Sequence, residues 1–118
     1  MIRLLRASAA VLLAVGLAAC SAGASASPVA TNQVDLPKSY KFEPEVITVP
    51  VGTTVTWTNH DDFTHNVRLL DDGGDTMQLA PGESVQFTFD TVGTHNYDCS
   101  FHPQDMKGSV IVTGPEGS

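Results

Sequence analysis

The chain has 118 residues, with 13 acidic against six basic side chains and a formal net charge of −7. Its length allows one domain at most. An acidic surface disfavours nucleic acid and anionic membrane faces as partners, and it favours either cationic partners or simple solubility.

The N-terminal segment, residues 1–19, has the pattern of a secretory signal. Arg3 and Arg6 precede an apolar run that is too short to span a membrane as a helix. The run leads into LAAC, residues 17–20, which resembles a bacterial lipobox. This resemblance implies cleavage before Cys20 and attachment of a lipid to its sulfur; the alternative is an ordinary signal with an incidental cysteine. Cleavage would leave four basic against thirteen acidic side chains, a net charge of −9.

A Ser/Ala/Gly stretch without charge follows the signal, and its apolar residues show no period. Such a composition cannot bury enough apolar surface to fold, so residues 20–34 are expected to be a flexible tether. The folded domain is expected over residues 35–114, with residues 115–118 as a short C-terminal tail.

Short runs rich in Val, Ile, Thr and aromatic residues fill this domain, and no helical period of useful length is present. Apolar side chains alternate with polar ones, as with Val55 and Trp57, which share one face. Strands are predicted at residues 45–49, 53–59, 65–70, 84–90, 94–99 and 108–113, with an edge strand at 39–42. Six to eight short antiparallel strands predict an all-β fold, either a β-sandwich or a closed barrel.

Alternation along the strand that ends at Cys99 places His95 and Tyr97 on the same face as the thiol. Because Tyr97 is a good core residue, Cys99 is expected to point inward at one end of the fold. His95 is expected to be a core histidine whose hydrogen bonds are satisfied. If Cys20 carries a lipid, Cys99 has no cysteine left with which to form a disulfide. A lone thiol in an oxidising compartment is a liability, so Cys99 is expected to have a specific role.

Three soft donor side chains lie within the eight residues CSFHPQDM, namely Cys99, His102 and Met106. His65 begins its own predicted strand and can join them if the two strands run so that their ends meet. One thiolate, two imidazoles and a thioether form the ligand set of a blue-copper site. Such a mixed set suits both copper oxidation states, so little rearrangement accompanies electron transfer.

Two long segments resemble the cupredoxins of the plastocyanin, amicyanin and pseudoazurin kind. They are FEPEVITVPVGTTVTWTNHDDFTHNV, residues 42–67, and FTFDTVGTHNYDCSFHPQDMKGSVIV, residues 87–112. The likeness covers about residues 40–113 and implies a Greek-key β-sandwich or barrel. Agreement of both segments in order and spacing makes it specific.

The resemblance implies one type 1 copper ion, with His65, Cys99 and His102 as equatorial ligands and Met106 as the axial ligand. It also implies that Asn66 braces the two ligand loops, with its backbone N–H directed at the Cys99 sulfur. The ligand loop reads C-x2-H-x3-M, intermediate between the amicyanin and plastocyanin lengths. Loop length controls how Met106 approaches the metal, so colour and potential do not follow from the resemblance.

The outer ring edge of His102 is implied to face solvent inside an apolar docking patch. Phe63, Phe101 and Pro103 are the expected members of that patch, and ordinary packing is their alternative role. Five loop aspartates form either a second docking patch for a cationic partner or merely solvated loops. They are Asp61, Asp62, Asp71, Asp72 and Asp75.

These features predict a one-electron type 1 copper carrier at the extracytoplasmic face of a membrane, in the periplasm or on the cell surface. It is expected to be a monomer, anchored only by the lipid on Cys20, with redox donor and acceptor proteins as partners, cationic or membrane-bound. The alternative is a module that buffers or delivers copper without an electron-transfer role. A thiol hydrolase using Cys99 would lack an oxyanion hole and an orienting third group, so no enzymatic activity is expected.

Overall fold

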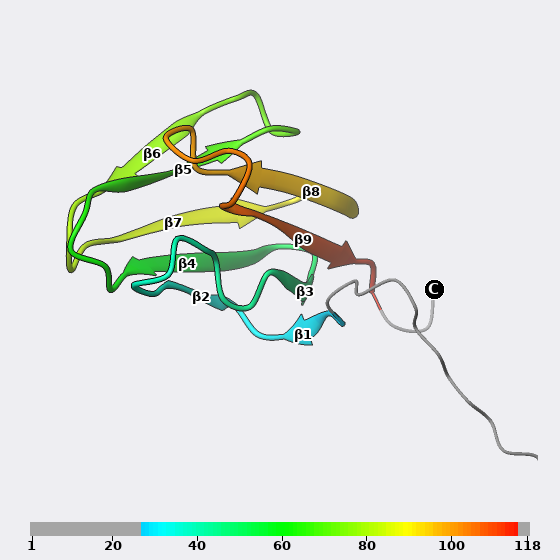
Figure 1. Cartoon of the computed structure of the whole chain (residues 1–118). Helices are drawn as coiled ribbons and strands as arrows, with labels where there is room; N and C mark the ends of the chain where they lie inside the picture. Colours follow the sequence, from blue (N-terminus) through cyan, green and yellow to red (C-terminus); the bar gives the residue numbers. More distant parts are fainter. Residues whose placement is uncertain (1–26, 116–118) are drawn as a thin grey trace, which may run out of the picture.

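The computed structural model describes residues 27–115, which form nine strands in two sheets (Figure 1). The larger sheet has the order β1 (Val29–Ala30), β3 (Val46–Pro50), β9 (Lys107–Thr113), β8 (Gly93–Asp98), β5 (His65–Leu69), β6 (Thr76–Leu79). The smaller sheet has the order β2 (Gln33–Leu36), β4 (Thr53–Asn59), β7 (Ser84–Phe89). The all-β prediction is confirmed, and no helix within residues 27–115 is long and apolar enough to cross a membrane.

Both sheets mix parallel and antiparallel neighbours. The pairs β1·β3, β2·β4 and β3·β9 are parallel, whereas β4·β7, β5·β6, β5·β8 and β8·β9 are antiparallel. Parallel neighbours need crossover connections instead of hairpins, so the chain passes between the two sheets. The prediction of a purely antiparallel arrangement is therefore refined to a mixed one.

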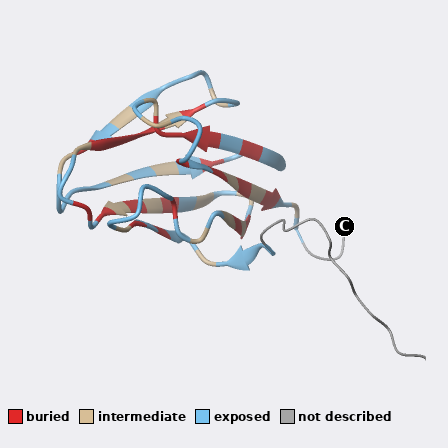
Figure 2. Ribbon diagram, in the orientation of Figure 1, coloured by how far each residue is buried: buried red, intermediate tan, exposed pale blue. Residues whose placement is uncertain are grey.

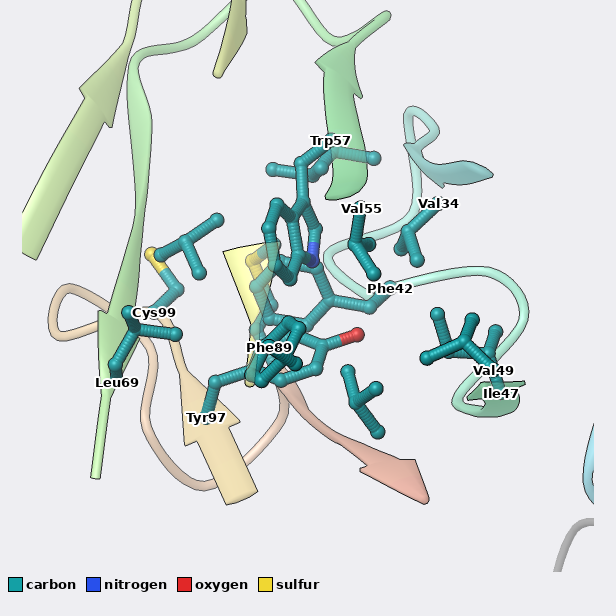
Figure 3. Close-up of a cluster of buried hydrophobic side chains, with 14 of the residues drawn as sticks. Val34, Phe42, Ile47, Val49, Val55, Trp57, Leu69, Phe89, Tyr97 and Cys99 are labelled. Atoms are coloured by element: carbon teal, nitrogen blue, oxygen red, sulfur yellow. The ribbon is translucent and has the colours of Figure 1, made fainter. Parts of the chain in front are cut away.

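The two sheets share one apolar core, as the buried segments of both show in Figure 2. The rings of Trp57 in β4 and Tyr97 in β8 pack edge to face with centroids 5.3 Å apart, and those of Phe42 and Tyr97 do so with centroids 4.8 Å apart. Edge-to-face contacts of this kind stabilise aromatic clusters beyond the area they bury. Figure 3 shows part of this cluster. Its buried members are Val34, Leu36, Phe42, Ile47, Val49, Val55, Trp57, Val67, Leu69, Leu79, Phe89, Tyr97, Cys99, Met106, Val110 and Val112.

The boundary between tether and domain was predicted too late in the chain. Strands β1 and β2 lie wholly or partly within residues 20–34, and the Val34 side chain is fully buried. The four-residue alternation of β2 is too short to stand out from a linker, and it becomes a strand because it pairs with β4. The predicted signal, Cys20 and residues 116–118 of the predicted tail lie outside the described residues.

Two further strand predictions differ from the structure. Residues 39–42 form a turn and not an edge strand, since only Glu43 forms a bridge, with Asp35. Conversely, no strand is predicted over residues 76–79, but they form β6, which pairs with β5, and Met77 in it packs against the core. In both cases long-range partners, absent from local sequence, decide the outcome.

Gly108 at the start of β9 allows the backbone to approach the Tyr97 ring. A Cβ atom at this position would lie 2.5 Å from the Tyr97 hydroxyl oxygen and 2.8 Å from the Glu45 carbonyl oxygen. Real Cβ atoms do not come so close, and neither backbone nor a packed ring yields easily.

We therefore expect Gly108→Ala to lower the free energy of unfolding by about 1–3 kcal/mol, because it overpacks the core. Urea denaturation measures this change. Gly114→Ala is the matched control, since its Cβ would meet only Val92 at 3.8 Å. Equal stabilities of the two variants would contradict the close-packing argument.

His95 in β8 is buried and bonded on both ring nitrogens to groups that only accept. Its Nδ1 lies 2.9 Å from the Asp72 carboxylate, and its Nε2 lies 2.7 Å from the Thr91 carbonyl oxygen. Both nitrogens therefore donate, which requires the charged imidazolium. Burial opposes the charge, but the bonds to Asp72 and Thr91 outweigh it and raise the pKa of His95. The expected core histidine is thus a charged one.

The pKa of His95 is higher in the folded than in the unfolded protein. The charged His95–Asp72 pair therefore contributes its full stability below the unfolded pKa of about 6.5, and this stability is lost as the pH rises through the folded pKa. We expect the stability advantage of the wild type over Asp72→Asn to shrink between about pH 6 and about pH 9. Urea denaturation at both pH values measures it, with the exposed Asp75→Asn as control. An advantage that stays constant or grows with pH would contradict the charged pair.

Candidate metal centre

The pairing of β5 with β8 brings His65 and Cys99 to the same end of the sandwich. The strands are antiparallel with Arg68 opposite Asp98, so the start of β5 lies beside the residues that follow β8. The guanidinium of Arg68 fastens this register with two hydrogen bonds of 2.8 Å to the Asp98 carboxylate. The strand directions that the sequence left open thus do bring these two candidate ligands together.

The thiol of Cys99 and the imidazole of His65 face one another inside the protein. The Cys99 Sγ lies 3.8 Å from His65 Nδ1, and both residues are fully buried. Cys99 is a free cysteine and belongs to the buried cluster that includes Tyr97 (Figure 3). Met106, directly before β9, is also fully buried.

His102 lies nearby, but its ring is half-buried and turned toward other aromatic residues. Its ring centroid is 5.9 Å from that of His65 and 4.8 Å from that of Tyr40. Within residues 27–115, no three side chains of the types His, Cys, Asp and Glu are gathered into a closed ligand cluster. Two candidate ligands are therefore directly apposed, and His102 lies at the solvent side of them.

The loop that joins β8 to β9 (orange in Figure 1) is folded back on itself by its own backbone. The His102 N–H donates to the Cys99 carbonyl, at 3.0 Å, and the Met106 N–H donates to the His102 carbonyl, at 2.8 Å. The Cys99 N–H then donates to the Met106 carbonyl at 3.0 Å. These bonds bring the backbone of Met106 back to that of Cys99, and both side chains are buried in the core.

Asn66 links this loop to β5 through both ends of its side-chain amide. Its Oδ1 accepts from the Ser100 N–H at 2.8 Å, and its Nδ2 donates to the Ser100 hydroxyl at 2.7 Å. The residue after His65 is thereby tied to the residue after Cys99. This contact gives the expected bracing role of Asn66 a physical basis.

Asp61 orients the His65 ring, a role that the sequence did not reveal. Its Oδ2 lies 2.8 Å from His65 Nε2, and its own N–H donates to Asn59 Oδ1 at 2.8 Å. The hydrogen bond from His65 lowers the pKa of Asp61 and outweighs the opposing effect of burial. A carboxylate only accepts, so Nε2 carries a proton, and in the neutral imidazole, the form that binds a metal, Nδ1 presents its lone pair toward Cys99. Fixing a tautomer in this way prepares a histidine for metal binding.

The five loop aspartates therefore do not act as one free acidic patch. Asp61 is buried against His65, and Asp72 holds His95. Asp71 accepts from the Asn96 N–H at 2.7 Å, while Asp62 pairs with Lys38 at 3.2 Å. The partners of Asp62, Asp71 and Asp72 come from distant segments, and His65 lies four residues after Asp61 across a loop of no regular geometry, so no local sequence signal distinguishes these roles.

The three expected patch residues are exposed: Phe63 by 58%, Phe101 by 54%, and Pro103. Tyr40, which the sequence did not single out, is exposed by 41% and contacts both His102 and Phe63 with its ring. Large apolar side chains exposed around a half-buried histidine are typical of a contact surface.

The donor chemistry of this end of the fold fits copper. A buried free thiol, a thioether and two imidazoles combine soft sulfur with nitrogen, whereas zinc sites in proteins usually lack thioether ligands. Preset orientation of His65 and the closed loop around Cys99 supply the rigid surroundings that such a site needs.

Comparison with known proteins agrees with this chemistry. The family described as "Cupredoxin-like domain" matches residues 9–112. Plastocyanin from Scenedesmus fuscus is 40% identical over 83 residues, which cover 60% of this chain and 85% of that protein. Amicyanin-alpha from Methylorubrum extorquens is 32% identical over 104 residues, 80% of this chain and 86% of that protein.

Solved structures of the same kind superpose on the chain. A purple cupredoxin from Nitrosopumilus maritimus gives a TM-score of 0.61 at 33% identity, covering 69% of this chain and 98% of that one. The reduced form of an amicyanin mutant gives a TM-score of 0.62 at 31% identity, and the match covers 76% of this chain and 95% of that one. The chain belongs to the cupredoxin family, as the resemblance of its two long segments implies.

We expect Asp61→Ala to weaken copper binding by about 10- to 100-fold, because His65 loses the bond that fixes its tautomer. Asp61→Asn should bind more tightly than Asp61→Ala, since its amide oxygen can still accept from Nε2. Competition with a chromophoric chelator measures both affinities. Asp62→Ala, one residue away and exposed, is the control; a loss as large as that of Asp61→Ala would contradict a specific role for Asp61.

Proposed function

We propose that the chain is a type 1 copper electron-transfer protein that carries one electron as Cu(I). The ligands in this proposal are His65, Cys99, His102 and Met106. One observation carries it: Cys99 Sγ and the lone-pair nitrogen of His65 face one another at 3.8 Å in the core. Family membership supports it, since relatives named plastocyanin and amicyanin-alpha match this chain in sequence, and amicyanin also matches it in structure.

Bound copper would supply the one-electron couple, and the chain supplies rigid surroundings. Asp61 and Asn59 hold His65 from behind, and Asn66 ties the two ligand segments together. The loop bonds between Cys99 and Met106 keep both sulfur side chains in the core. Since these contacts belong to strand ends and a closed loop, they resist rearrangement when the metal changes charge, which favours fast electron transfer.

The electron enters and leaves at the His102 edge in this proposal. This is the candidate ligand that solvent reaches; the exposed Phe101 and Pro103 flank it in the chain, and the exposed Phe63 stacks on the Tyr40 ring that contacts it. The partners are redox donor and acceptor proteins that dock there, and the carrier is a monomer. A lipid on Cys20 would anchor it outside the cytoplasm and raise its effective concentration near membrane-bound partners.

Visible absorption and EPR of the purified chain after addition of copper(II) test this function. We expect an intense thiolate-to-copper band with narrow copper hyperfine splitting, and loss of both in Cys99→Ser, because the band requires the thiolate. Met77→Leu, which removes a thioether on β6, is the control and should retain the spectrum.

A pale wild-type sample with ordinary copper(II) splitting would contradict the electron-carrier function. Copper buffering or delivery would then take its place, provided that the chain still binds copper tightly. Retention of the intense band in Cys99→Ser would instead remove Cys99 from the ligand set.

A further inference from the structure

Tyr40 has an unusual backbone conformation at the end of the molecule that holds the candidate ligands. Its φ is +53°, and within residues 27–115 it is the one residue other than glycine with a positive φ. A tyrosine in this left-handed region costs conformational free energy, and residues so strained concentrate at functional sites. Glycine or asparagine would fit the same turn more easily, so the side chain needs its own explanation.

In this strained conformation, the Tyr40 ring contacts both candidate histidine ligands. Its centroid lies 4.8 Å from that of His102, at an interplanar angle of 67°, and 5.9 Å from that of His65, at 89°. The Tyr40 ring also stacks on that of Phe63, with ring centroids 6.3 Å apart and an interplanar angle of 21°. Among the described residues its hydroxyl forms no hydrogen bond that would otherwise hold it there. Ring contacts therefore account for its position.

The turn that carries Tyr40 is closed at its base and is not a loose flap. Asp35 and Glu43 exchange two backbone hydrogen bonds of 2.8 Å, which clamp the segment between them. Within it, the Ser39 N–H donates to the Pro37 carbonyl at 2.7 Å, and Lys38 pairs with Asp62 at 3.2 Å. The ring is thus presented to the histidines by a clamped turn.

His102 needs such support more than His65 does. The His65 ring is buried and bonded to Asp61, whereas the His102 ring is half-buried and accepts or donates no hydrogen bond within residues 27–115. The ring contacts found for His102 are those with Tyr40 and His65. Tyr40 is therefore the neighbour that can fix the orientation of this ring from the solvent side.

We propose that Tyr40 is a positioning residue that caps the metal centre: it holds the His102 ring and blocks small external ligands from the two histidines. This inference rests on the proposed function for its metal, but the ring contact itself involves only side chains of this chain. The cap covers the histidine edges where an anion or water would otherwise approach.

The first test uses NMR of the metal-free chain with Tyr40→Ala, Tyr40→Gly and Tyr40→Phe. The His102 ring protons should move toward free-imidazole shifts in the Ala and Gly variants, because the aromatic neighbour is gone, and stay near wild-type values in Tyr40→Phe. Gly relieves the backbone strain and Ala does not, so agreement between them assigns the effect to the ring. Unchanged His102 shifts in Tyr40→Ala would overturn the proposal.

The second test titrates azide into the copper(II)-loaded proteins and follows the visible spectrum. Loss of the aromatic contact should raise the apparent azide affinity of Tyr40→Ala and Tyr40→Gly by about two- to tenfold, with Tyr40→Phe like the wild type. Equal azide affinity in all four proteins would overturn the cap. A wild-type protein without a type 1 spectrum would contradict the proposed function instead, and the metal-free NMR result would still decide the role of Tyr40.

Discussion

The antiparallel pairing of β5 with β8 is the constraint on which this end of the molecule depends. Because Arg68 lies opposite Asp98 and is bonded to it, the start of β5 must lie beside the residues that leave β8. His65 and Cys99 meet for that reason alone. A shift by one residue would turn either side chain to the opposite face of the sheet, away from its partner.

Support for the candidate ligands is uneven, and the unevenness follows the layers of the fold. On the buried side, Asp61 orients the His65 ring, and Asn66, the next residue, is hydrogen-bonded to Ser100, which follows Cys99. On the solvent side, the ring of His102 has aromatic contacts but no hydrogen bond within residues 27–115, and the nearer of its two aromatic neighbours is Tyr40, with ring centroids 4.8 Å apart. A rigid interior with one accessible edge would suit the proposed electron-transfer centre.

Acidic side chains illustrate why composition misleads about function. The strongly negative chain allows either an acidic docking patch or merely solvated loops, yet Asp61 and Asp72 each engage a histidine, and Asp98 engages Arg68. Burial makes these charges structural, because a buried carboxylate is stable only with a donor beside it. Their partners lie in other strands or loops, so charge counting could not separate them from solvated loop residues.

The sequence by itself determined the all-β class, six of the nine strands, and the inward direction of Cys99, since alternation of apolar residues depends only on strand geometry. It also determined the soft donor set at 99–106. Tertiary structure decided the rest: β2 is a strand because β4 pairs with it, Asp61 is a support because it meets His65, and Tyr40 covers His102. The β2–β4 and Tyr40–His102 contacts join segments far apart in the chain, and Asp61 reaches His65 across an irregular loop, so sequence spacing fixes none of these geometries and only the packed fold supplies them.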